Sequence, residues 1–101
     1  MLRHIVMFKL QDEALGQPKA ENAKRIKRDL EALKSRIPEI RSLEVGINCN
    51  HVPGEWDVVL VSEFDDLESM KRYQAHPEHV KVGEFIAQVR SDRAFADYLR
   101  D

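Results

Sequence analysis

The segment LRHIVMFKL near the start of the chain constrains the fold more than any other part of the sequence. It is β-prone, and successive side chains of a strand point to opposite faces of a sheet. One face therefore carries His4, Val6 and Phe8, and the other carries Ile5 and Met7. Because both faces are apolar we expect both to be buried, and a chain of 101 residues is short for covering two faces of a sheet.

A helix and a hairpin are predicted after this first strand. Apolar residues recur at three- and four-residue steps from Ala23 to Ile37, which predicts an amphipathic helix that covers one sheet face and is ended by Pro38. Alternating apolar residues then predict strands over about residues 40–49 and 56–64. The loop between these strands is short, so we expect them to pair as an antiparallel hairpin.

Two further helices and a final strand complete the predicted order of elements. Asp65 or Asp66 can cap a short helix, which the His76-Pro77 pair interrupts because a residue before proline avoids helical angles. Proline favours the first position of a helix, so the next helix can open there. Residues 93–99 fit either an edge strand or a helical turn, and we choose the strand because it completes a β-α-β-β-α-β order.

The predicted fold is α+β: one ferredoxin-like domain over residues 1–101 with a four-stranded antiparallel sheet. Its helices can cover only one face of that sheet. We expect the face of His4, Val6 and Phe8, together with the opposite faces of the hairpin strands, to need another cover. A second copy of the chain is the simplest source, so we expect a homodimer that closes a dimeric α/β barrel.

Charge and apolar patterning argue against nucleic-acid and membrane partners. Sixteen basic and eighteen acidic side chains give a net charge of -2, with both signs interleaved along the chain. The longest apolar runs, such as residues 58–61, are far too short to span a bilayer. Residues 1–15 carry charges where a signal peptide would be apolar, so we expect a cytoplasmic protein. The single cysteine, Cys49, has no disulfide partner, and we expect a half-buried strand residue.

Two short motifs give the chain a family resemblance. Residues 4–9 follow the pattern HxVxFK, and residues 73–80 follow the pattern YxxHPxHV at the right distance downstream. Together they resemble the stress-responsive A/B barrel family, often called Dabb, and the resemblance extends over essentially the whole chain to Asp97 and Tyr98. It implies a homodimer in which two four-stranded sheets pack face to face into a barrel.

The same resemblance implies where chemistry would occur. Some plant members of the family are associated with stress tolerance, and one plant branch is a polyketide cyclase that performs an aldol condensation without a cofactor. The tyrosine and second histidine of the YxxHPxH motif are catalytic in that branch, which implies Tyr73 and His79 here. The third strand departs from that branch, because this chain has Asp57 after Glu55-Trp56 where the plant enzymes have a histidine after a Tyr-Thr pair.

His79 is the candidate base. It falls at about the third position of the helix that Pro77 opens, where the positive end of the helix dipole disfavours the imidazolium form. A neutral imidazole can abstract a proton next to a carbonyl group, and the Tyr73 phenol could polarise that carbonyl. Alternatively, Tyr73 is a core aromatic residue, and His76 and His79 hold the interhelical turn through hydrogen bonds to the backbone.

A binding pocket beside these residues is expected to include His4, Val6, Phe8 and His76. His4 could equally be a buried histidine whose hydrogen bonds are satisfied. We expect no metal site and no cofactor, because the two histidines of the HPxH motif lack a third ligand at a recognisable spacing. Some plant relatives bind a cation through main-chain carbonyls after the first helix, which implies a location near residues 33–39 without a side-chain signature.

Two classes of function follow. The first is a cofactor-independent lyase or cyclase that acts on a small, mostly apolar carbonyl compound, with His79 as the base and Tyr73 as the polarising donor. Related dimeric barrels also include monooxygenases that act on quinol-like substrates without metals, which is an analogy of fold alone. The second class is a non-catalytic stress-response dimer, structural or binding a small molecule, in which the same residues are structural.

Overall fold

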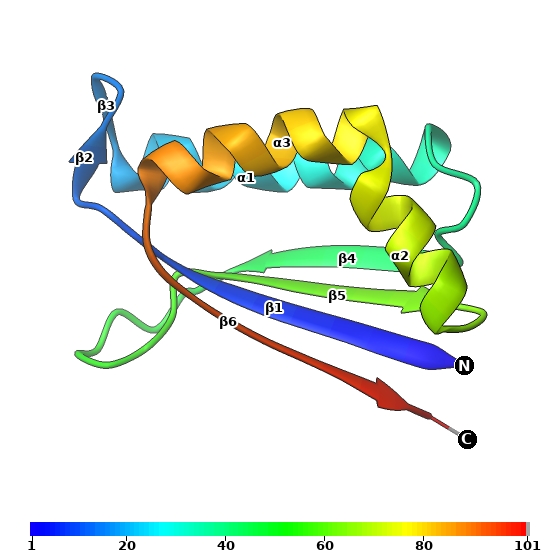
Figure 1. Ribbon diagram of the computed structural model, residues 1–101. Helices are drawn as coiled ribbons and strands as arrows, with labels where there is room; N and C mark the ends of the chain where they lie inside the picture. Colours follow the sequence, from blue (N-terminus) through cyan, green and yellow to red (C-terminus); the bar gives the residue numbers. More distant parts are fainter. Residues whose placement is uncertain (101) are drawn as a thin grey trace.

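The main sheet has four antiparallel strands in the order β4-β5-β1-β6, and the helices lie on one of its faces (Figure 1). The computed structural model describes residues 1–100. The predicted ferredoxin-like α+β fold with a four-stranded antiparallel sheet is confirmed. The elements in chain order are β1 (Leu2–Leu10), β2 (Glu13–Ala14), β3 (Gln17–Pro18), α1 (Lys19–Ala32), a short 3-10 helix (Leu33–Ser35), β4 (Ser42–Ile47), β5 (Val58–Phe64), α2 (Leu67–Ala75), α3 (Pro77–Val89) and β6 (Arg90–Leu99).

Strand β1 lies inside the sheet, between β5 and β6. Its even-numbered residues, which include His4, Val6 and Phe8, are all buried on the side of the helices. The expectation that this face needs a second subunit is therefore wrong, because helices of the same chain cover it (Figure 1). The face that the chain leaves without a cover is the one that carries Ile5 and Met7, which are only half-buried.

Helix α1 packs on the sheet through one apolar stripe. Ala23, Ile26 and Leu30 are buried at three- and four-residue spacing, as the amphipathic pattern predicts. The helix ends at Ala32, and the stripe continues through the short 3-10 helix, where Leu33 is fully buried. No helix within residues 1–100 is long and apolar enough to cross a membrane.

A single residue separates α2 from α3. His76 has an extended backbone with φ -64° and ψ 134°, as expected before a proline, and Pro77 takes the first position of α3. The Nδ1 atom of His76 accepts a hydrogen bond from the main-chain N–H of Glu78 at 3.1 Å, so the histidine caps α3. This corner fixes the direction of α3 and places His79 in its first turn.

The sheet face opposite the helices is apolar at its centre. Directly paired residues of antiparallel strands lie on the same face, so the strand register defines its members. No helix within residues 1–100 covers this surface (Figure 1). This open face consists of Ile5, Met7, Val59, Val61, Ala94 and Ala96.

The structure corrects several predicted boundaries. Strands β4 and β5 are both shorter than predicted, and β6 begins at Arg90, directly after α3. Of the two expected capping residues, Asp66 is the one that caps α2, with its Oδ1 atom accepting from the main-chain N–H of Ser69 at 2.8 Å. Cys49 is exposed and lies beyond the end of β4, so the expectation of a half-buried strand residue is wrong.

The small β2-β3 hairpin was not expected. The two residues between its strands, Leu15 and Gly16, have φ values of 53° and 75°. Such left-handed angles at both positions are typical of a tight two-residue hairpin turn. Asn22 at the start of α1 secures this turn, because its side-chain amide donates to the main-chain oxygen of Ala14 at 3.1 Å.

Candidate functional site

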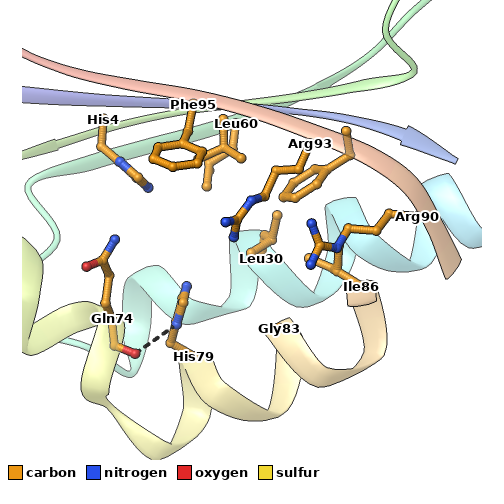
Figure 2. A pocket seen from close by; sticks show the side chains of 12 residues that line it. His4, Leu30, Leu60, Gln74, His79, Gly83, Ile86, Arg90, Arg93 and Phe95 are labelled. Carbon is orange, nitrogen blue, oxygen red and sulfur yellow. Dashed lines mark hydrogen bonds between the residues drawn. The ribbon is translucent and has the colours of Figure 1, made fainter. Parts of the chain in front are cut away.

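A cavity of about 250 Å³ lies between the sheet and the helices (Figure 2). Strands β1, β5 and β6 form one wall, and the other wall comes from α1, α3 and the end of α2. Drug-sized ligands occupy cavities of about 300–1,000 Å³, so this one suits a smaller organic molecule. The residues that line it are His4, Val6, Phe8, Leu30, Leu60, Gln74, His79, Gly83, Ile86, Arg90, Arg93 and Phe95.

His79 points its ring from the first turn of α3 into this cavity (Figure 2). Its Nδ1 atom lies 3.1 Å from the main-chain oxygen of Gln74. A carbonyl oxygen only accepts hydrogen bonds, so Nδ1 carries the hydrogen and Nε2 keeps a free lone pair in the neutral ring.

The environment of His79 also favours the neutral ring. Burial lowers the pKa of His79 below its ordinary value of 6.5 and is the largest cause. The nearby His4 and His76 lower this pKa further, and the hydrogen bond to Gln74 opposes them. At neutral pH the ring is therefore an uncharged base that faces the cavity.

His4 is oriented by an acidic residue from the last strand. Asp97 is its partner in the β1-β6 register, and Nδ1 of His4 is hydrogen-bonded to Oδ1 of Asp97. Because the carboxylate accepts, Nδ1 donates, and Nε2 remains free toward the cavity. His4 is therefore a buried histidine with a satisfied hydrogen bond and also a cavity residue.

Tyr73 lies behind the two histidines, not on the cavity wall. It is 0% exposed, and its ring centroid lies 4.4 Å from that of His79 and 6.4 Å from that of His4. Its buried hydroxyl has no hydrogen-bond partner within the described chain, and such an unsatisfied group costs about 1–3 kcal/mol. Burial raises the pKa of Tyr73 well above its ordinary value, so the phenol stays protonated and remains a donor.

The cavity brings together part of the predicted pocket. His4, Val6, Phe8 and His79 line it, whereas His76 does not, because its ring is occupied in capping α3. Among residues 1–100, no group of three His, Cys, Asp or Glu side chains is arranged to hold a metal ion.

Asp57 also lies away from the cavity. Its Oδ2 atom accepts a hydrogen bond from the main-chain N–H of Leu10 at 2.8 Å and lies 3.6 Å from Nζ of Lys19. This carboxylate therefore ties the start of β5 to the end of β1. Asp57, the position at which the sequence departs from the plant cyclases, therefore stabilises the sheet in this chain.

Several residues of the site were not predicted from the sequence. Asp97 acquires its role only when β6 is in register with β1, which no local pattern reveals. Gly83 did carry a signal, because a glycine inside a helix costs about 1 kcal/mol relative to alanine. A Cβ atom at Gly83 would meet no atom within 4 Å, so the glycine leaves open space on the cavity wall.

The lowered pKa of His79 predicts how stability depends on pH. Well above pH 6.5 the ring is neutral in the folded and the unfolded chain and makes no pH-dependent contribution. As the pH falls through that value, the unfolded chain binds the proton first, so the free energy of unfolding decreases until the pH reaches the lower pKa of the folded chain. Urea unfolding of the parent protein and of His79→Gln from about pH 8 to pH 5 measures this effect. If the free energy of unfolding changed with pH by the same amount in both proteins, the prediction would be contradicted.

Comparison with known proteins gives a match over nearly the whole chain. The profile of the family described as Stress Responsive A/B Barrel Domain matches residues 2–99. An uncharacterized protein of Streptomyces coelicolor is 33% identical over 98 residues, which are 97% of this chain and 98% of that protein.

Solved structures share the fold. A dimeric protein of unknown function and ferredoxin-like fold from Bacteroides fragilis is 44% identical, with a TM-score of 0.82 over 96% of this chain and 93% of that chain. A hydroxynitrile lyase from Passiflora edulis has a TM-score of 0.81 over 99% of this chain and 93% of that chain, and at 14% identity it is similar in fold alone. The motifs, the fold and the extent of these matches agree, and the chain belongs to the stress responsive A/B barrel domain family.

Proposed function

We propose that this chain is a homodimer in which each subunit binds a small, mostly apolar carbonyl compound and acts on it as a cofactor-independent lyase or cyclase. The observation that carries this proposal is that the neutral ring of His79 lines a cavity of about 250 Å³. An uncharged imidazole in this cavity suits the abstraction of a proton next to a carbonyl group, because its free nitrogen lone pair can accept the proton.

In the proposed step, Nε2 of His79 removes a proton from the carbon next to the bound carbonyl group. The electron pair of the broken C–H bond forms a carbon–carbon double bond, and the carbonyl oxygen becomes an enolate oxygen. The enolate then attacks a second carbonyl of the ligand in a cyclase, or expels a leaving group in a lyase. His79 returns its proton to the oxygen or the group that has gained the electron pair.

Two neighbouring residues have supporting roles in this proposal. The Tyr73 hydroxyl stays protonated and lacks a partner within the described chain, so it is assigned as the donor to the enolate oxygen. His4 and His79 both line the cavity, and their ring centroids lie 6.4 Å and 4.4 Å from that of Tyr73, so the ligand oxygen has to lodge between the two histidines to reach this hydroxyl. His4, which Asp97 holds in one orientation, positions the ligand.

The open face supports the proposed homodimer. It presents six apolar side chains that no helix of the described chain covers. The Bacteroides fragilis protein, 44% identical to this chain, is described as dimeric. Pairing of two open faces leaves the helices outside, so each subunit keeps its own cavity.

Deuterium exchange into a simple ketone tests the proposed chemistry. The methyl protons of acetophenone exchange with D2O through its enolate, and proton NMR follows the loss of their signal. We expect the protein to accelerate this exchange above the rate in buffer of the same pH. A bound ketone whose exchange is not accelerated would contradict the assignment of His79 as a base.

Filling the cavity with a larger side chain at Gly83 should lower activity without lowering the stability of the fold. Gly83→Leu is expected to slow acetophenone exchange by at least about ten-fold, because its side chain enters the open space on the cavity wall. It should also raise the free energy of unfolding by about 0.5–1 kcal/mol, because it removes a helical glycine. The matched control is Gly83→Ala, which gives the same helical gain but leaves most of the cavity, so its exchange rate should stay near that of the parent protein. Equal exchange rates in the two variants would argue against this cavity.

A binding dimer without catalysis is the second candidate. The complete burial of Tyr73 and its absence from the cavity wall favour it, because a structural aromatic residue needs no contact with a ligand. This candidate predicts that acetophenone binds in the cavity while its methyl protons exchange at the rate of the buffer.

A further inference from the structure

Among residues 1–100, the fully charged side chains that line the cavity are all basic. Arg90 and Arg93 line it, whereas no aspartate or glutamate of this part of the chain does. The whole chain has the opposite balance, with 18 acidic and 16 basic side chains. The cavity therefore differs in charge from the chain that surrounds it.

Both arginines come from the start of β6 and direct their side chains toward the cavity (Figure 2). Arg90 follows the last residue of α3 without a loop, so the end of a helix and the start of a strand fix its backbone. The guanidinium of Arg93 lies over the ring of Phe95, with its Cζ atom 4.8 Å from the ring centroid. The contact with Phe95 and the junction between α3 and β6 thus place the two arginines together at the β6 side of the cavity.

Neither guanidinium is neutralised inside the described chain. Among residues 1–100, no carboxylate oxygen lies within 4.0 Å of a side-chain nitrogen of Arg90 or Arg93, although most other arginines have such a partner. The carboxylate closest in sequence, that of Asp92, accepts from the main-chain N–H of Arg93 at 2.8 Å instead. Two arginines free of ion pairs within the described chain are suited to bind an anionic group of a ligand.

We propose that the ligand of this cavity is a carboxylate, whose anionic group binds Arg90 and Arg93 while its apolar body lies against Val6, Phe8 and Ile86. The inference rests on the proposed function and specifies its substrate class. The anionic group then lies at the β6 end of the cavity, and the rest of the molecule extends toward His4 and His79. The arginines select and orient the ligand, and the chemical step stays with His79 and Tyr73.

A pair of probes that differ only in charge tests this proposal. We would titrate the intact protein with 2-naphthoate and with its uncharged amide, 2-naphthamide, and follow binding by calorimetry. The carboxylate should bind about ten- to one hundred-fold more tightly than the amide, because hydrogen bonds to a charged group contribute more binding free energy than those to a neutral group. In Arg90→Gln/Arg93→Gln, the affinity for 2-naphthoate should fall to that for 2-naphthamide, and the affinity for the amide should stay within about two-fold.

The matched control removes two positive charges elsewhere. Arg28 and Lys34 are exposed and do not line the cavity, so Arg28→Gln/Lys34→Gln should keep the preference for the carboxylate. If the double variant at the cavity does not fold, the exposed Arg93→Gln alone should lower the preference at least about three-fold.

The outcomes separate this inference from the proposed function. Equal binding of both probes by the parent protein, or an undiminished preference in the arginine variants, would overturn the carboxylate assignment and leave the pocket intact. An equal loss in the control variant would show a general effect of net charge and would also overturn it. Failure of both probes to bind the parent protein would overturn the pocket itself.

Discussion

Replacing Val61 by glutamate is expected to convert the protein from a dimer to a monomer. Val61 lies at the centre of the open face, where it pairs with Ile5 of β1 and with Glu44 of β4. Two-fold symmetry brings the new carboxylate into the interface twice, and each buried unpaired charge costs several kcal/mol. The dissociation constant of the dimer should therefore rise at least about 1,000-fold, which corresponds to about 4 kcal/mol.

Sedimentation at micromolar concentration measures this change directly. The parent protein should sediment at about twice 11.7 kDa, and its Tm should rise with protein concentration. The matched control is Val52→Glu, which makes the same chemical change in an exposed loop where Val52 is 49% exposed, and it should remain a dimer. A parent protein that is a stable monomer, or a Val61→Glu variant that still dimerises as tightly, would exclude the open face as the interface.

Replacing His79 by alanine is expected to reduce the protein's acceleration of acetophenone exchange over the rate in buffer by about 100- to 10,000-fold. This is the usual contribution of a general base. The His79 ring is half-buried, and its hydrogen bond to Gln74 lies at the corner between α2 and α3, so the variant should keep its fold. Circular dichroism and sedimentation would check the fold and the assembly.

The chain offers a control for the chemistry of this substitution. His51 is an exposed histidine in the loop between β4 and β5, so His51→Ala removes an imidazole without touching the cavity. Its exchange rate should equal that of the parent protein. If His79→Ala exchanges acetophenone as fast as His51→Ala, His79 is not the base.

The elements of this fold were predictable because their signals are local. The His76-Pro77 break, the cap of α2 and the stripe on α1 depend on residues within a turn or two of each other. The orientation of β1 was harder, because both of its faces are apolar. Its signal lay in Arg3 and Lys9, which share the face of Ile5 and Met7 and mark it as the side without helices.

The candidate site was predictable only where a motif names it. His79 and His4 stand in recognisable patterns, whereas Asp97 joins them through the strand register, which alternation alone does not define. Arg90 and Arg93 were missed for a related reason, because β6 starts at the last turn of α3 without a loop to announce it. Local motifs thus identify His4 and His79, whereas the positions of Asp97, Arg90 and Arg93 depend on how β6 pairs with β1.

The contact between His4 and Asp97 joins residues 93 positions apart in the chain. During synthesis, β1 and all three helices emerge before β6 is complete, so the His4 ring lacks its carboxylate partner and the sheet-side wall of the cavity is incomplete. Docking of the last strand supplies Asp97, Phe95 and both arginines in a single event. A growing or incompletely folded chain therefore has no assembled pocket, and the binding of a ligand would report that the fold is finished.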